Sequence, residues 1–222
     1  MKFRKIFITA FIAGMILITS IASAGRVDER IYIVPAGDVN VKVIEALKAR
    51  IPEPLMMVAK VEVLQSQTIP NQSYEPSRHQ YMAEMVLGDV SANINLDEGV
   101  ESALIVMDGD IYSQDTDFVF GIMRKPRPVA LISLARLKNE FYGLAPDEKL
   151  FLDRSVKEAL YQLGLAWGLE PCPNQKCIMH TAKNVSDIDK KSGRFCVECK
   201  KNMQKRYTSP LIKKNILDKL AI

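Results

Sequence analysis

Four cysteines near the C-terminus have the residue type and the spacing of a metal site. Cys172 and Cys177 form a C-x4-C pair, and Cys196 and Cys199 form a C-x2-C pair eighteen residues further on. Two short cysteine pairs joined by a loop are a common way to place four thiolates around one tetrahedral zinc ion. The sequence therefore predicts one structural Zn²⁺ held by these four cysteines.

Disulfide bonds are the alternative for the same residues, because cysteines in an oxidising compartment pair with one another. The pairing would be local, Cys172 with Cys177 and Cys196 with Cys199, or it would cross the loop. We favour zinc, since folding around the ion is strongly favourable. A redox role for the second pair has less support, because no thioredoxin-like setting precedes it.

The N-terminus has the features of an export signal. A basic start is followed by an apolar run at residues 6–21 and by the small residues Ala22-Ser23-Ala24. We expect residues 1–24 to be a cleaved signal peptide of a periplasmic or secreted protein. A membrane anchor formed by residues 6–21 is the alternative, because the run is slightly long for a cleaved signal and short for a spanning helix. Cleavage lowers the formal charge from +4 to about +1, so no nucleic-acid partner is indicated.

Strands and helices alternate ahead of the cysteines, which predicts an α/β fold with a sheet and packed helices. Strands are expected at residues 30–34, 57–64, 103–107, 118–123 and 128–134. Helices are expected at 41–50, at 77–93 from a capping box of Ser77 and Gln80, and from residue 146 onward. The last helix is almost wholly apolar from residue 159 to residue 169, so it is expected to lie inside the protein, across the sheet.

From Tyr161 to Cys199 the chain resembles the archaemetzincins, a family of zinc metallopeptidases of the metzincin clan. Their signature HExxHxxGxxH is followed by C-x4-C-x-M and then by C-x2-C. Here the chain reads YQLGLAWGLEP and then Cys172, with Gly168, Met179 and the other cysteines in register. Segments 31–35, 78–81, 133–137 and 141–144 also look like archaemetzincin segments. The resemblance implies a metzincin-like twisted mixed sheet, a long signature helix and a small C-terminal four-cysteine zinc subdomain.

The resemblance also implies a catalytic zinc whose ligands this chain lacks. The three histidine positions and the position of the glutamate base hold, in order, Tyr161, Leu165, Pro171 and Gln162. Leucine and proline have no donor atom, tyrosine binds a metal only as the phenolate, and glutamine cannot accept a proton at neutral pH. The chain has two histidines, His79 and His180, so a three-histidine site is excluded by count.

We therefore expect no catalytic Zn²⁺ and no hydrolysis. The apolar replacements are expected to fill the vacated space, with Met179 packed beneath it as in the Met-turn of the family. Glu158 is expected on the surface of the long helix, and Glu170 is expected in the turn that follows it. Contact with anionic lipid is a less favoured role than solvation for the basic segment after Cys199.

The expected division is a signal peptide or anchor at 1–24, a metzincin-like α/β domain at 25–171, a four-cysteine zinc-knuckle subdomain at 172–202 and a basic tail at 203–222. Three functions remain open. The first is a non-catalytic homologue that binds an extended peptide or protein along the edge strand 117–123 through backbone pairing. The second is an active zinc-dependent metallopeptidase with non-standard ligands. The third is a structural zinc- or disulfide-stabilised envelope protein whose cleft is closed.

Overall fold

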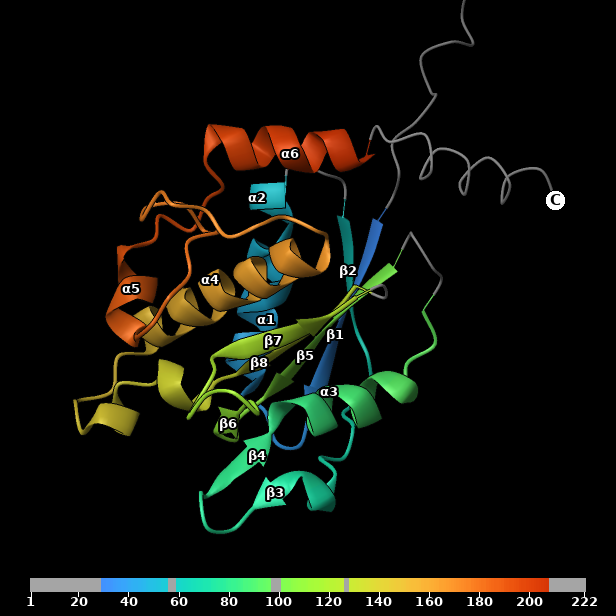
Figure 1. The fold of residues 1–222 in the computed structure, drawn as a ribbon. Helices are drawn as coiled ribbons and strands as arrows, with labels where there is room; N and C mark the ends of the chain where they lie inside the picture. The colour runs from blue at the N-terminus through green and yellow to red at the C-terminus, as the bar shows by residue number, and fades with distance from the viewer. Residues whose placement is uncertain (1–28, 56–58, 97–100, 126–127, 208–222) are drawn as a thin grey trace, which may run out of the picture.

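The computed structural model describes residues 29–55, 59–96, 101–125 and 128–207. Its main sheet has five strands in the order β2-β1-β5-β8-β7 (Figure 1). Strands β2, β1, β5 and β8 are parallel, and β7 is antiparallel to β8 at one edge. The bounds are Glu29–Ala36 for β1, Ala59–Val63 for β2, Glu101–Met107 for β5, Gly121–Arg124 for β7 and Val129–Ser133 for β8.

Helices cover both faces of this sheet. Successive strand residues point to opposite faces, so Leu104 and Val106 of β5 join one core while Ile105 and Met107 join the other. The first core packs against α1 (Val41–Arg50) and α4 (Glu148–Ala166), and the second packs against α3 (Ala83–Ala92) (Figure 1). The mixed α/β fold predicted from the sequence is confirmed, including the long helix packed across the sheet.

The capping box predicted at Ser77 and Gln80 is wrong. The Ser77 hydroxyl donates to the Glu75 carboxylate at 2.6 Å, and Gln80 pairs with Glu75 in a second, small sheet. This sheet has the order β3-β4-β6, with β3 at Tyr74–Glu75, β4 at Gln80–Met82 and β6 at Ile111–Tyr112. Helix α3 begins at Ala83 because strand pairing uses the preceding residues.

Local sequence signals set both ends of α4. The Asp147 side chain accepts a hydrogen bond from the backbone N–H of Leu150 and caps the start of the helix. At the other end Gly168 adopts φ +89°, and the N–H of Leu169 donates to the carbonyl of Gly164. This is a Schellman ending, which favours glycine at the left-handed position. The chain therefore turns sharply just before Cys172.

Two further helices, α5 (Val185–Lys190) and α6 (Val197–Tyr207), carry the C-terminal part of the described chain, and a short helix α2 (Pro52–Leu55) follows α1. The predicted strand at 118–123 is shorter in the structure and begins at Gly121. Residues 57–58 of another predicted strand, the expected signal at 1–24 and residues 208–222 of the expected tail lie outside the described residues. No helix within the described ranges is long and apolar enough to cross a bilayer.

Candidate metal centre and the adjoining cleft

The structure brings the four cysteine thiols together at one point. Their sulfur atoms all lie within 4.8 Å of one another. The Sγ atoms of Cys172 and Cys196 are 3.8 Å apart, and those of Cys177 and Cys199 are 3.7 Å apart. A tetrahedral zinc with Zn–S bonds of about 2.3 Å requires sulfur–sulfur edges of about 3.8 Å. The four cysteines therefore fit the geometry of a tetrahedral zinc site.

Backbone hydrogen bonds hold the two cysteine pairs in this arrangement. The N–H of Cys172 donates to the carbonyl of Met179 at 2.7 Å, which closes the first pair into a loop. The N–H of Ile178 donates to the carbonyl of Arg194 at 2.9 Å and joins the first pair to the second. Cys199 lies in the first turn of α6. The site is thus built by main-chain contacts between segments that are about twenty residues apart.

The thiols differ in environment. A hydrogen bond from the backbone of Cys199 lowers the pKa of Cys196 to about 7. Burial raises the pKa of Cys177 and of Cys199. A bound cation stabilises the thiolate form, so metal binding releases the thiol protons and offsets the cost of burying the charged sulfur atoms. Metal binding therefore has to offset the burial of Cys177 and Cys199.

Metal removal under oxidising conditions is expected to produce disulfides across the loop, Cys172 with Cys196 and Cys177 with Cys199. These pairs have sulfur atoms 3.8 and 3.7 Å apart, so modest side-chain rotation brings them to bonding distance. Peptide mapping of chelated, air-oxidised protein measures the pairing. Recovery of mainly the local pairs, Cys172 with Cys177 and Cys196 with Cys199, would contradict the expected pairing.

The residues at the signature positions present few donors. Leu165 lies on α4 and lines a cleft, and Pro171 follows the Gly168 turn. The Tyr161 hydroxyl and the Thr181 hydroxyl are 3.2 Å apart and share a hydrogen bond. Burial raises the pKa of Tyr161, which disfavours the phenolate that a metal would need. These residues do not fit a catalytic zinc.

Glu158 is buried, which corrects the prediction from the sequence that it lies on the helix surface. Its side chain is 2% exposed, and Oε1 accepts a hydrogen bond from Nε2 of Gln162 at 2.8 Å. Burial raises the pKa of Glu158, while the charge of Lys191 and the Gln162 hydrogen bond act in the opposite direction. Glu158 is therefore an interior carboxyl group on the same side of α4 as Gln162.

Lys191 is a buried cation whose charge acts on Glu158, a placement that the sequence did not predict. Its residue is 2% exposed, and Nζ lies 4.3 Å from the centre of the Tyr161 ring. Burial lowers the pKa of Lys191, and the charge of Glu158 raises it. The one signal in the sequence was a lysine in the segment between the two cysteine pairs, and nothing in that pattern separated it from its exposed neighbour Lys190.

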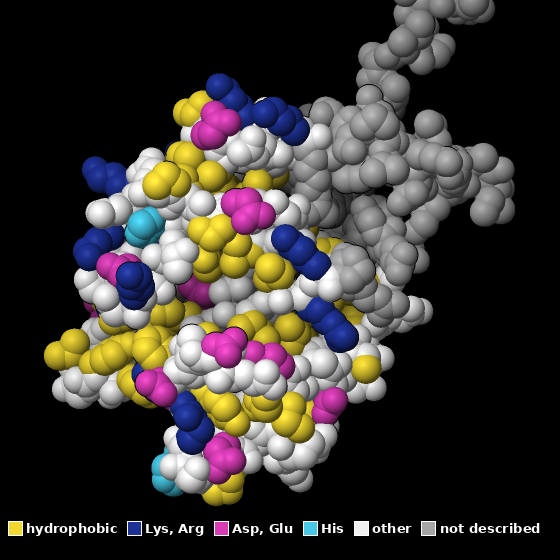
Figure 2. Space-filling view, in the orientation of Figure 1, with side chains coloured by type: hydrophobic (Ala, Val, Ile, Leu, Met, Phe, Trp, Pro, Cys, Tyr) yellow, Lys and Arg dark blue, Asp and Glu magenta, His cyan; other side chains and the backbone are white. Residues whose placement is uncertain are grey.

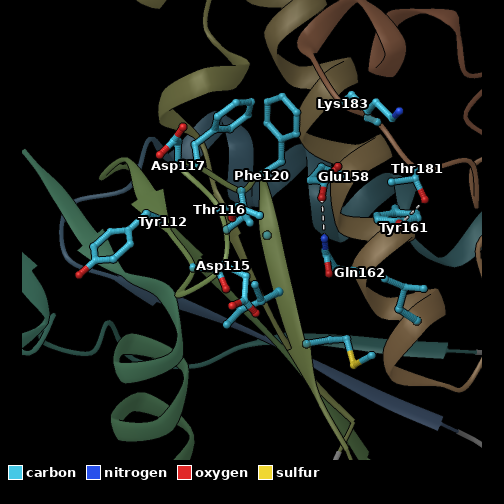
Figure 3. A pocket seen from close by; sticks show the side chains of 18 of the residues that line it. Tyr112, Asp115, Thr116, Asp117, Phe120, Glu158, Tyr161, Gln162, Thr181 and Lys183 are labelled. Atoms are coloured by element: carbon cyan, nitrogen blue, oxygen red, sulfur yellow. Dashed lines mark hydrogen bonds between the residues drawn. The ribbon is translucent and has the colours of Figure 1, made fainter. Parts of the chain in front are cut away.

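An open cleft of about 990 Å³ lies beside these residues. Strand β7 separates its two walls, with residues of the 112–117 segment on one side and α4 residues on the other (Figure 3). On the face of the molecule drawn in Figure 2, hydrophobic side chains gather across the middle. Leu165 packs against the main hydrophobic core and also lines this cleft. The lining also includes Arg78, Tyr112, Phe118, Phe120, Gly121, Ile122, Met123, Glu158, Tyr161, Gln162, Thr181 and Lys183.

Met179 packs directly beneath α4. It is fully buried, and a Cβ placed on Gly164 would come within 2.5 Å of its sulfur atom. Glycine at position 164 therefore allows the loop of the first cysteine pair to approach the helix. His180 is half-buried, and its Nδ1 lies 2.9 Å from the carbonyl oxygen of Cys172. His79, the other histidine, is exposed and lies outside this site.

Known proteins resemble this chain over most of its length. The model of peptidase family M54 matches residues 23–205. The archaemetzincin of Pyrococcus furiosus is 37% identical over 181 residues, which cover 80% of this chain and 94% of that protein. The archaemetzincin of Methanocaldococcus jannaschii is 36% identical over 177 residues, with the same two shares.

Solved structures give the same result. The crystal structure of archaemetzincin from Methanopyrus kandleri matches with a TM-score of 0.70 and 27% identity, and covers 84% of this chain and 99% of that one. A zinc-dependent peptidase from Methanocorpusculum labreanum matches with a TM-score of 0.71 and 29% identity, and covers 78% of this chain and 99% of that one. The chain belongs to the archaemetzincins, peptidase family M54.

Proposed function

We propose that this archaemetzincin is a non-hydrolytic homologue that keeps one structural zinc and binds an extended peptide in its cleft. The observation that carries the proposal is an open cleft along an edge strand, beside a signature helix whose ligand positions lack metal donors. The four cysteines form the one group of three or more metal-ligating side chains found among the described residues. The zinc would be held there and would join the two cysteine pairs.

The exposed edge of β7 supports peptide binding. The N–H of Ser133 donates to the carbonyl of Phe120, and β7 continues antiparallel to β8 from Gly121. In an antiparallel pair, alternate residues point their N–H and C=O groups toward and away from the partner strand. By this alternation Gly121 and Met123 point their backbone groups away from β8, where an added strand would pair with them. Such pairing needs no metal.

The experiment uses residues 25–222 of the chain and a library of acetylated, amidated heptapeptides. We expect about one zinc per chain, retention of a subset of peptides, and no cleavage of any library member by mass spectrometry. Met123→Pro removes one outward N–H and is expected to lower retention about tenfold or more. Met123→Ala is the matched control, because it shortens the side chain and leaves the N–H in place.

Each alternative function gives a different result. Two zinc ions per chain and chelator-sensitive cleavage would establish an active metallopeptidase with non-standard ligands and would overturn the proposal. Zinc at one per chain with no retained peptide would support a purely structural role. The open cleft argues against the version of that role in which the cleft is closed.

We also propose that the protein acts outside the cytoplasm. The basic start, the apolar run at residues 6–21 and Ala22-Ser23-Ala24 support this. Expression of the full chain in a secreting host is expected to give a product that begins at Gly25. N-terminal sequencing and the intact mass measure this. A product that keeps residues 1–24 and sediments with membranes would instead indicate an anchor.

A further inference from the structure

Three buried polar atoms near the cleft have no hydrogen-bond partner among the residues that the structure describes. They are Oε2 of Glu158, Oε1 of Gln162 and Nζ of Lys191. Glu158 and Gln162 line the cleft and are 2% and 4% exposed, so they are well over nine-tenths buried. Buried polar groups are nearly always satisfied by protein, water or ligand. Oε1 of Gln162 is an acceptor whatever the protonation state of Glu158, so the partner that it lacks is a donor.

Glu158 fixes the way in which the Gln162 amide points. In the structure Gln162 turns its NH₂ group toward Glu158, whose Oε1 accepts the hydrogen bond. The Nε2–Oε1 distance is 2.8 Å. Figure 3 shows Gln162 with its nitrogen toward Glu158 and its oxygen pointing away from that residue. Burial is the largest influence on Glu158 and raises its pKa, while the charge of Lys191 and the Gln162 hydrogen bond act in the opposite direction.

Gln162 also lies directly against the edge strand. A Cβ placed on Gly121 would come within 2.9 Å of Cγ of Gln162. Both residues line the cleft. The amide carbon of Gln162 would lie 3.1 Å from the same Cβ, so the amide group is placed beside β7. Its Oε1 is covered by neighbouring atoms, so contact with a peptide along β7 requires a small rotation of this side chain.

We propose that Oε1 of Gln162 accepts a hydrogen bond from a backbone N–H of the bound peptide, and that Glu158 is the positioning residue that turns this oxygen toward the peptide. The inference rests on the proposed function and names one determinant of its specificity. The ligand class is an extended peptide with a free amide N–H opposite Gln162. Proline or an N-alkylated residue at that position cannot supply this hydrogen bond and therefore binds less tightly.

The test begins with the tightest-binding heptapeptide from the library above. That peptide is resynthesised as a set of variants, each with one N-methyl group. Each variant is titrated into residues 25–222 of the wild-type chain and into the same chain with Gln162→Met. This substitution keeps a similar side-chain volume and removes the acceptor. We expect one N-methyl position to lower affinity about tenfold or more in the wild-type chain and to have little effect in Gln162→Met. N-methyl losses that report pairing with β7 are expected to persist in both proteins.

Glu158→Gln tests the positioning role. It keeps the volume and the hydrogen-bonding capacity of the side chain but no longer dictates which end of the Gln162 amide faces it. We expect the preference for N–H over N-methyl peptide to fall several-fold and the side-chain NH₂ resonances of Gln162 to move in a ¹⁵N spectrum. Unchanged discrimination in this variant would remove Glu158 from the proposal.

The outcomes separate this inference from the function on which it depends. Failure of the wild-type chain to retain any peptide overturns both. Retention that Met123→Pro abolishes but Gln162→Met leaves unchanged, with every N-methyl effect preserved, overturns this inference alone. Zinc content and thermal unfolding of each variant are measured alongside. If Gln162→Met has lost its zinc and its cooperative unfolding transition, Gln162→Leu replaces it.

Discussion

Cys199→Ser is expected to abolish zinc binding and to lower the free energy of unfolding by several kcal/mol, because structural zinc sites contribute folding energy directly. Cys199 belongs to the main hydrophobic core together with Ile178, Phe195 and Met203. Loss of the metal therefore releases both cysteine pairs and the core residues that they hold. Zinc content and chemical denaturation followed by the fluorescence of the single, buried Trp167 measure the effect.

Lys201→Ser is the matched control for this experiment. Lys201 lies in the same helix, α6, and its side chain is exposed. The Lys201→Ser variant should keep one zinc per chain and nearly wild-type stability, since substitutions at exposed residues change the free energy of unfolding by about 0.5 kcal/mol or less. A wild-type chain that contains no zinc and four oxidised cysteines would contradict the zinc site.

Restoring the signature is expected to raise the metal content from about one to about two zinc ions per chain. The change combines Tyr161→His, Leu165→His and Pro171→His. Residues 161 and 165 are one helical turn apart on α4 and both line the cleft, and the turn at Gly168 ends the helix three residues before position 171. Two histidines at this spacing on one helix face and a third histidine after the turn provide the three protein ligands of a catalytic zinc ion.

Hydrolysis is expected to require one further change, Gln162→Glu. A positioned general base contributes about 10²–10⁴-fold to a rate, so the variant with glutamate should cleave peptides faster than the three-histidine variant by about that factor. The three-histidine variant with Gln162 kept is the control, because it binds the second zinc without the base. Failure to bind a second zinc in a variant that folds would show that more than these positions separates this chain from the active members of its family.

Residues close together in the chain were read correctly where local contacts decide the structure. The start of the long helix close to residue 146, the turn after it and the buried strand predicted at 103–107 depend on neighbouring residues or on hydrophobic pattern alone. The grouping of the four cysteines was also visible, because metal chemistry constrains their spacing. Ser77 and Gln80 show the limit of such reasoning, since pairing with Glu75 and contact with Asp110 override the helix start that they predict.

The sequence by itself determined the family, the α/β fold and the absence of histidine ligands, because these follow from residue types at fixed spacing. Only the tertiary structure decided that the cleft stays open, that Glu158 faces inward and that Lys191 lies against Tyr161. The reason is that burial and charge pairing depend on segments brought together by packing. Lys191 follows Tyr161 by thirty residues, and no local pattern encodes which face of α4 it meets.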